Sequence, residues 1–206
     1  MTFKVLIAKS LRAILQPASI DNSKLNKHSR VCSGAHIKEC IIGKYSYIGH
    51  DVFALKTSFG NYCSIADNCR IGGHEHDFSF VSTSPVFHSG RNLFKINFAN
   101  FMEEPTKNTH IGSDVWIGAN SIIKSGINIG NGVIIGAGSV VTHDVPDFEI
   151  WAGCPAKKIK DRFPPEIISE LLTIEWWNWD DETIKKYAGL FDDPLSLISE
   201  FKKKEM

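Results

Sequence analysis

The residues with the clearest capacity for chemistry lie in one short segment, Gly72-Gly-His-Glu-His-Asp77. An imidazole with an ordinary pKa of about 6.5 can accept a proton from a hydroxyl group at neutral pH and return it later. Such a base also needs its second ring nitrogen held, a role open to Asp77 or to a main-chain carbonyl. The segment therefore predicts general acid–base chemistry, with His74 or His76 as the base.

The same side chains also belong to the types that bind zinc. His74, His76 and Asp77 have suitable ligand atoms, but no further ligand follows at a fixed spacing, and His110 is the nearest alternative by residue type. We expect no metal at this segment.

A six-residue repeat of apolar residues indicates the scaffold that positions this segment. The repeat is clearest late in the chain, at Ile111, Ile117, Ile123, Ile129, Ile135 and Val141. Six residues of an α-helix rotate by about 600°, so a helix would scatter these side chains over its surface. A triangular coil satisfies the period, because each hexad supplies one short strand and one corner, and three hexads complete a turn. Residues 18 apart, such as Ile111 and Ile129, then stack in neighbouring parallel strands.

The same repeat occurs earlier with one shortened step, at Ile42, Ile48, Phe53, Phe59, Ile65 and Ile71. Val31 and Ile37 add an incomplete turn before it. The predicted fold class is therefore mainly β, a parallel β-helix shaped as a triangular prism of about four to five coils.

The cysteines suit packing rather than a disulfide framework or a zinc site, because the five of them include no Cys-x-x-Cys pair. They are Cys32, Cys40, Cys63, Cys69 and Cys154. Cys63 and Cys69 fall at the small inward position of a hexad, so we expect them in the core and not as nucleophiles.

Two segments depart from the repeat. Residues 73–109 form a long excursion from the coil, and loops of that length are usually functional. After Pro146 the hexads fade, and three sites are typical of helix starts: Pro164-Pro165, Asp180-Asp181 and Asp193-Pro194. We divide the chain into a β-helix domain, residues 1–163, with an N-terminal cap segment, and a helical appendage, residues 164–206. The tryptophans at 176, 177 and 179 are expected to pack the appendage.

Composition and charge narrow the classes of function. The 23 basic and 23 acidic residues give a formal net charge of zero, which argues against a nucleic-acid binder because phosphate contacts need a surplus of Lys and Arg. No apolar stretch reaches the roughly 20 residues of a membrane span. Lys4, Lys9 and Arg12 interrupt the first segment where a signal peptide would be apolar. We therefore expect a cytoplasmic protein whose first segment caps the coil, with membrane-surface contact as the less favoured alternative.

Four motifs carry a resemblance to a known family: Gly72 to Phe87, Ile111-Gly-Ser-Asp-Val-Trp-Ile-Gly118, Ala152 to Phe163, and Glu175-Trp-Trp-Asn-Trp179. From about residue 31 to about residue 180, the chain resembles the xenobiotic acetyltransferase branch of the left-handed parallel β-helix (hexapeptide) acyltransferases. That branch includes chloramphenicol and streptogramin acetyltransferases and many sugar O-acetyltransferases. The resemblance implies a left-handed coil and acetyl transfer from acetyl-coenzyme A to a hydroxyl, in a homotrimer with active sites between subunits.

The resemblance also implies roles for particular residues. The family's catalytic histidine precedes an Asp by three residues, which matches His74 and Asp77, and transfer is direct, without an acyl-enzyme. Coenzyme contacts are implied for Trp116, Gly118, Ala119, Gly136, Ala137, Ala156, Lys157, Lys158 and Arg162. The basic members of this set suit phosphate groups. Cys154 stands where the family commonly has Asn.

The acceptor is predicted from the excursion, which is rich in Phe and therefore offers aromatic faces to a planar or ring-shaped molecule. A sugar or polysaccharide hydroxyl is the first hypothesis. The alternatives are an antibiotic such as chloramphenicol or a streptogramin, and the amine of a nucleotide-linked amino sugar. A β-helix that serves only as a scaffold is the hypothesis from a different class, and the presence of His74 argues against it.

Overall fold

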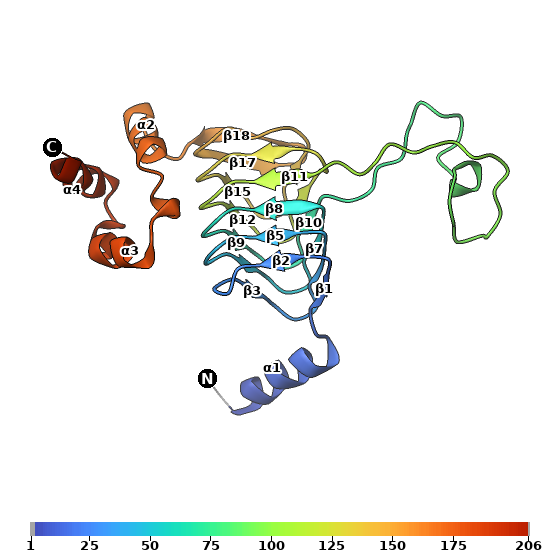
Figure 1. The fold of residues 1–206 in the computed structure, drawn as a ribbon, viewed down its shortest axis with the longest axis horizontal. Helices are drawn as coiled ribbons and strands as arrows, with labels where there is room; N and C mark the ends of the chain where they lie inside the picture. The colour runs from blue at the N-terminus through green and yellow to red at the C-terminus, as the bar shows by residue number, and fades with distance from the viewer. Residues whose placement is uncertain (1–2, 206) are drawn as a thin grey trace.

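The computed structural model describes residues 3–205 and shows a triangular coil of short parallel strands (Figure 1). Face 1 of the prism contains β1 (Ser19–Asp21), β4 (His36–Lys38), β7 (Phe53–Leu55), β10 (Arg70–Ile71), β13 (Ile122–Ile123) and β16 (Val140–Val141). Face 2 contains β2 (Lys24–Leu25), β5 (Ile41–Ile42), β8 (Thr57–Phe59), β11 (Thr109–Ile111) and β14 (Asn128–Ile129). Face 3 contains β3 (Arg30–Val31), β6 (Tyr47–Ile48), β9 (Ser64–Ile65), β12 (Trp116–Ile117), β15 (Ile134–Ile135), β17 (Glu149–Gly153) and β18 (Ala156–Asp161). The predicted parallel β-helix is confirmed.

The chain visits the three faces in turn, and each strand pairs in parallel with the strand one coil away. The exception is the hairpin of β17 and β18, which is antiparallel and closes the end of face 3. Side chains from all three faces meet on the axis, where Ile48, Ile117 and Ile135 have no exposed surface. Cys63 and Cys69 lie in the same core, as predicted, and burial raises the pKa of Cys63 to about 11.

The early coils are one residue shorter than the hexads predict. Ile37 pairs with Ala54, and Ala54 pairs with Ile71, so the stacked residues are 17 apart. The shortened corner between face 1 and face 2 is turned by a residue with left-handed backbone, Glu39 in one coil (φ 54°) and Lys56 in the next (φ 48°). A single left-handed residue changes the direction of the chain at each of these corners.

This shorter corner corrects one predicted core position. The repeat predicts Phe53 on the axis, because it places the shortened step before Phe53. The shortened step instead follows β7, so Ala54 is the inward residue, with no exposed surface, and the prediction for Phe53 is wrong. The Phe53 ring lies on the outside, with the Arg70 guanidinium 5.8 Å from its centre.

The excursion leaves the coil after β10 and returns at β11, and its one element of secondary structure is the 3₁₀ turn η1 (Pro85–Phe87). It projects sideways from the corner between face 1 and face 2 (Figure 1). The departure starts at Gly72, whose φ is 69°. Only glycine fits at this position, because any side chain would press against the Leu55 carbonyl oxygen.

The C-terminal part forms helices on the opposite side of the prism (Figure 1). They are α2 (Pro165–Ile174), η2 (Trp176–Asn178), α3 (Asp181–Tyr187), η3 (Ala188–Leu190) and α4 (Pro194–Glu205). All three predicted helix starts are confirmed. Asp180 caps α3 by accepting a hydrogen bond from the Thr183 amide, 2.7 Å away. Trp177 is buried in a second apolar cluster that the Trp176 and Trp179 rings join, so the tryptophans pack this region as predicted.

The N-terminal helix α1 (Phe3–Leu15) lies beyond the first coil, and its Arg12 forms an ion pair with Asp51, which lies between β6 and β7. Ile14 and Leu15 are 73% and 75% exposed, so these apolar side chains do not cover the open end of the coil. Within residues 3–205, every helix falls short of the length and apolarity that a membrane crossing requires.

Candidate functional site

His74 lies at the mouth of the excursion, where the rigid coil ends. Its Nδ1 atom is 2.7 Å from the Thr106 hydroxyl oxygen, which belongs to the segment returning to the coil. When Nδ1 carries the proton and donates it to that oxygen, Nε2 has a free lone pair and can act as a base. The structure therefore holds His74 by a side chain that sequence analysis missed. No spacing pattern marks Thr106, because the contact joins residues 32 positions apart.

Asp77 has a different partner. Its carboxylate accepts hydrogen bonds from the Ser79 amide at 2.8 Å and from the Ser79 hydroxyl at 2.6 Å. The Ser79 hydroxyl, and then the Ser79 amide, lower the pKa of Asp77 because both stabilise the charged form. In this structure the carboxylate thus closes a local turn just beyond His74.

A cleft of about 310 Å³ runs beside the mouth of the excursion. It is lined by Glu75, His76, Asp77, Phe78, Glu104, Pro105, Thr106, Lys107 and Ser125. Glu75 also forms an ion pair with Lys124, at 3.5 Å, which ties the start of the excursion to the end of β13. Within residues 3–205, no three His, Cys, Asp or Glu side chains gather in an arrangement suited to a metal ion.

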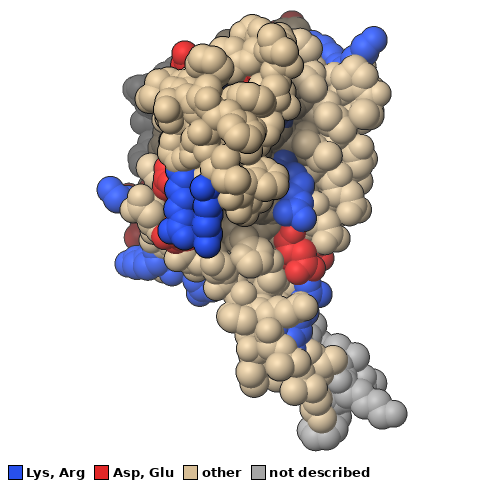
Figure 2. All heavy atoms as spheres, turned by 90° about the vertical axis from the view of Figure 1, so that its right-hand side faces the viewer, with Lys and Arg blue, Asp and Glu red and all other residues tan. Residues whose placement is uncertain are grey.

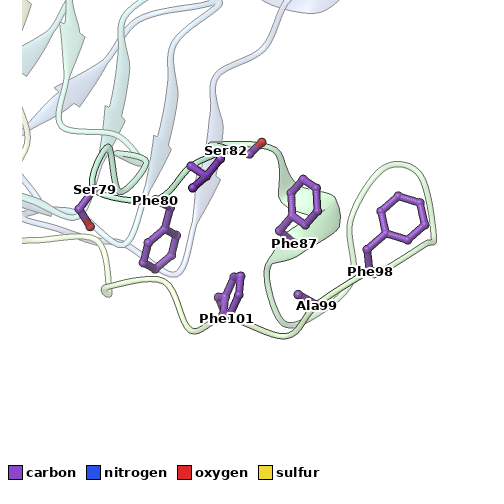
Figure 3. A pocket seen from close by; sticks show the side chains of 8 residues that line it. Ser79, Phe80, Ser82, Phe87, Phe98, Ala99 and Phe101 are labelled. Carbon is purple, nitrogen blue, oxygen red and sulfur yellow. The ribbon is translucent and has the colours of Figure 1, made fainter.

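A second, larger cavity of about 620 Å³ lies further out along the excursion. Figure 3 shows the Phe80 and Phe101 rings on facing segments of chain, with Phe87 and Phe98 nearer the tip. Ser79, Val81, Ser82 and Ala99 complete the lining. Figure 2 shows that the upper part of this side of the molecule is mostly uncharged, and that Lys and Arg side chains gather below that part. The excursion therefore offers an aromatic pocket with two hydroxyl groups.

The small residues implied in coenzyme binding lie at another corner of the prism. Gly118 and Ala119 connect β12 to β13, and Gly136 and Ala137 connect β15 to β16, so both pairs turn the chain from face 3 to face 1. A side chain at Gly118 would approach the Ala137 amide nitrogen to 2.5 Å. Close stacking of the coils thus accounts for this buried glycine, while Ala137 at the same corner is exposed.

Trp116 is on face 3 and is 51% exposed, so its ring is available to a partner. His74 is at the corner between face 1 and face 2. The fold does not bring these two side chains together within one chain, because they belong to different sides of the prism.

Two of the basic residues implied in coenzyme binding, Lys158 and Arg162, are paired with protein carboxylates. Lys158 forms ion pairs of 2.7 Å with both Glu149 and Asp161, and these carboxylates raise its pKa. Arg162 donates to Asp114 at 2.8 Å, at a corner between face 2 and face 3. Neither cation is free of protein carboxylates.

Three other residues of the hairpin of β17 and β18 differ from one another in solvent exposure. Lys157 is exposed and is in none of the ion pairs that the structure shows among the described residues. Ala156 is buried against the coil core, so only its main chain can face a ligand. Cys154 is exposed at the turn of the hairpin.

Comparisons with known proteins agree with this architecture. The family model described as bacterial transferase hexapeptide (six repeats) matches residues 108–143. A chloramphenicol acetyltransferase from Klebsiella aerogenes is 40% identical over 141 residues, which cover 63% of this chain and 63% of that protein, so the chain spans less than two thirds of that relative's length. A probable macrolide acetyltransferase from Lysinibacillus sphaericus is 38% identical over 159 residues, 76% of this chain and 82% of that protein.

Among solved structures, the polySia specific acetyltransferase NeuO aligns with a TM-score of 0.52 and 26% identity, over 71% of this chain and 62% of that chain. The match to the macrolide relative covers more than two thirds of both proteins. On this basis the chain belongs to the xenobiotic acetyltransferase branch of the hexapeptide-repeat transferases.

Proposed function

We propose that the protein is an acetyl-coenzyme A-dependent O-acetyltransferase with His74 as its general base. The observation that carries the proposal is the contact of His74 Nδ1 with the Thr106 hydroxyl, which leaves Nε2 free. Nε2 accepts the proton of the acceptor hydroxyl while the acceptor oxygen attacks the thioester carbonyl carbon. The carbon–sulfur bond breaks, and the imidazolium returns the proton to the leaving thiolate. The products are an acetyl ester and coenzyme A, and no protein nucleophile takes part.

In this mechanism Thr106 orients the base, and Asp77 shapes the loop around it. When the Thr106 hydroxyl oxygen accepts the Nδ1 proton, Nε2 is left unprotonated and can act as the base. Asp77 acts one step away, because its hydrogen bonds to Ser79 fix the turn that follows His74.

The site is proposed to form between neighbouring subunits of a homotrimer. His74 and Trp116 are on different sides of one prism, so a base from one copy meets a coenzyme surface from the next. The main-chain groups at the corners of Gly118, Ala119, Gly136 and Ala137 suit the thin pantetheine arm. Exposed Lys157 suits a phosphate group, whereas Lys158 and Arg162 would have to exchange a protein carboxylate for it.

A sugar or polysaccharide hydroxyl is the proposed acceptor. The Phe80 and Phe101 rings offer flat apolar faces on which the C–H face of a sugar ring can stack, and the Ser79 and Ser82 hydroxyls can bond its polar edge.

The second candidate acceptor is an antibiotic alcohol. It is favoured by the mostly apolar lining of the same pocket and by the names of the relatives. A panel of sugars, chloramphenicol and a macrolide, scored by release of free thiol from acetyl-coenzyme A, separates these candidates. Faster turnover of either drug than of every sugar overturns the sugar assignment.

The catalytic role is tested with His74→Ala. Loss of a positioned base is expected to lower kcat by about 10² to 10⁴ while coenzyme binding, measured by calorimetry, stays unchanged. His143→Ala is the matched control, because His143 also pairs with a threonine hydroxyl, Thr142 at 2.9 Å, but lies outside the excursion.

The shared site is tested by mixing two inactive variants. Co-expression of His74→Ala chains with Trp116→Ala chains should restore part of the activity, since some sites then combine an intact base with an intact ring. An inactive mixture that sediments as a trimer would contradict the shared site, and a 23 kDa monomer would contradict the assembly.

A further inference from the structure

The excursion has two limbs that are cross-connected by side chains. The outgoing limb is residues 73–88, and the returning limb is residues 97–108. Nearest the coil, His74 contacts Thr106. Next outward, His76 Nδ1 lies 3.4 Å from Glu103 Oε1, and His88 Nδ1 contacts the same oxygen. Beyond these, the Phe101 amide donates to the Phe87 carbonyl at 3.0 Å. One carboxylate thus connects to the outgoing limb at two places.

His88 depends on this carboxylate for its polar contact. Its side chain is 3% exposed and is packed edge-on against Phe80, with ring centres 5.8 Å apart. Within residues 3–205, neither of its ring nitrogens makes a hydrogen bond, and a Glu103 carboxylate oxygen is in contact with Nδ1. Burying a polar ring without a partner is unfavourable, and Glu103 supplies the compensating group.

Glu103 and its partner His76 lie close in the sequence to Thr106 and His74. Glu103 is three residues before Thr106 in the returning limb, and His76 is two residues after His74 in the outgoing limb. Among the side-chain contacts described between the two limbs, those of Glu103 are therefore the nearest along the chain to the contact of Thr106 with His74. The titratable groups that face Glu103 are His76 and His88, and neither is among the residues we place in catalysis.

We propose that Glu103 is a positioning residue, which holds the two limbs together through His76 and His88 and so keeps the Thr106 hydroxyl against His74. This inference rests on the proposed function, since it concerns the orientation of the proposed base. Glu103 touches neither the reacting atoms nor the coenzyme surface at the distant corner. Its loss is therefore expected to affect kcat and to leave the KM for acetyl-coenzyme A unchanged.

The first test is a double-mutant cycle. Glu103→Gln should lower kcat by about threefold to tenfold, because displacing the Thr106 hydroxyl can cost no more than removing a hydrogen bond of about 0.5–1.5 kcal/mol, and it should change the KM for acetyl-coenzyme A less than twofold. His88→Phe replaces the buried ring by an apolar one that needs no carboxylate. In that background Glu103→Gln should lower kcat less than threefold, because no buried group then loses its partner. Glu182→Gln, which removes an exposed carboxylate paired with Lys185, is the control and should match the wild type.

Two outcomes overturn the proposal: a wild-type kcat for Glu103→Gln, or an equal loss of kcat from this change in both backgrounds. A second measurement needs no activity. The ¹⁵N resonances of the His74 ring in the free protein should report one tautomer in the wild type and an averaged ring in Glu103→Gln. Unchanged resonances refute the positioning role. If the wild type transfers no acetyl group, the proposed function fails while the resonances still decide the role of Glu103.

Discussion

Thr106→Val separates the two residues that can orient the proposed base. Valine keeps the shape of threonine and removes the hydroxyl that lies 2.7 Å from His74 Nδ1. A hydrogen bond between neutral groups at an exposed site contributes about 0.5–1.5 kcal/mol net. If this contribution is fully realised in the transition state, its loss lowers kcat by about twofold to thirteenfold, because 1.4 kcal/mol corresponds to about a factor of ten. The coil is unaffected, so the melting temperature should stay at the wild-type value.

The assay is the initial rate of free-thiol release at saturating acetyl-coenzyme A, with the acceptor varied. Thr106→Ser keeps the hydroxyl and should retain most of the wild-type kcat. Asp77→Asn should cost less than Thr106→Val, because Asp77 bonds Ser79 and not the imidazole. A wild-type kcat for Thr106→Val together with a large loss for Asp77→Asn would refute the assignment and make the carboxylate the orienting group.

Two further predictions concern the coil. Gly118→Ala should destabilise the protein by about 1–3 kcal/mol, measured by urea unfolding, because the new methyl group would lie 2.5 Å from the Ala137 amide nitrogen; a midpoint equal to the wild type would show that the corner can expand. At pH 8 a thiol reagent should label exposed Cys154 first and leave Cys63 unlabelled until the chain unfolds, since burial raises the pKa of Cys63 to about 11 and removes its thiolate. Cys154→Ser should abolish the fast phase and leave the slower labelling of half-buried Cys32, and a fast phase that survives in Cys32→Ser/Cys154→Ser would contradict the burial of Cys40, Cys63 and Cys69.

The coil was predictable from the repeat alone, because a six-residue period is local information. Each lead residue specifies one inward position and one corner, so the spacing from Ile111 to Val141 predicted stacked parallel strands without knowledge of any contact. The helix starts at Pro165, Asp181 and Pro194 were equally predictable, since capping depends on residues within one turn. The interruption of the period likewise located the excursion.

Which side chains meet across that scaffold depends on contacts between distant residues, and these were not predictable from the repeat. The 17-residue coils became visible through pairings such as Ile37 with Ala54, and they moved the core position from Phe53 to Ala54. The contact of Thr106 with His74 joins residues 32 positions apart, on two limbs that no periodicity relates. Such contacts depend on how the chain returns after a long irregular segment, and that path is set by packing between distant residues rather than by local preference.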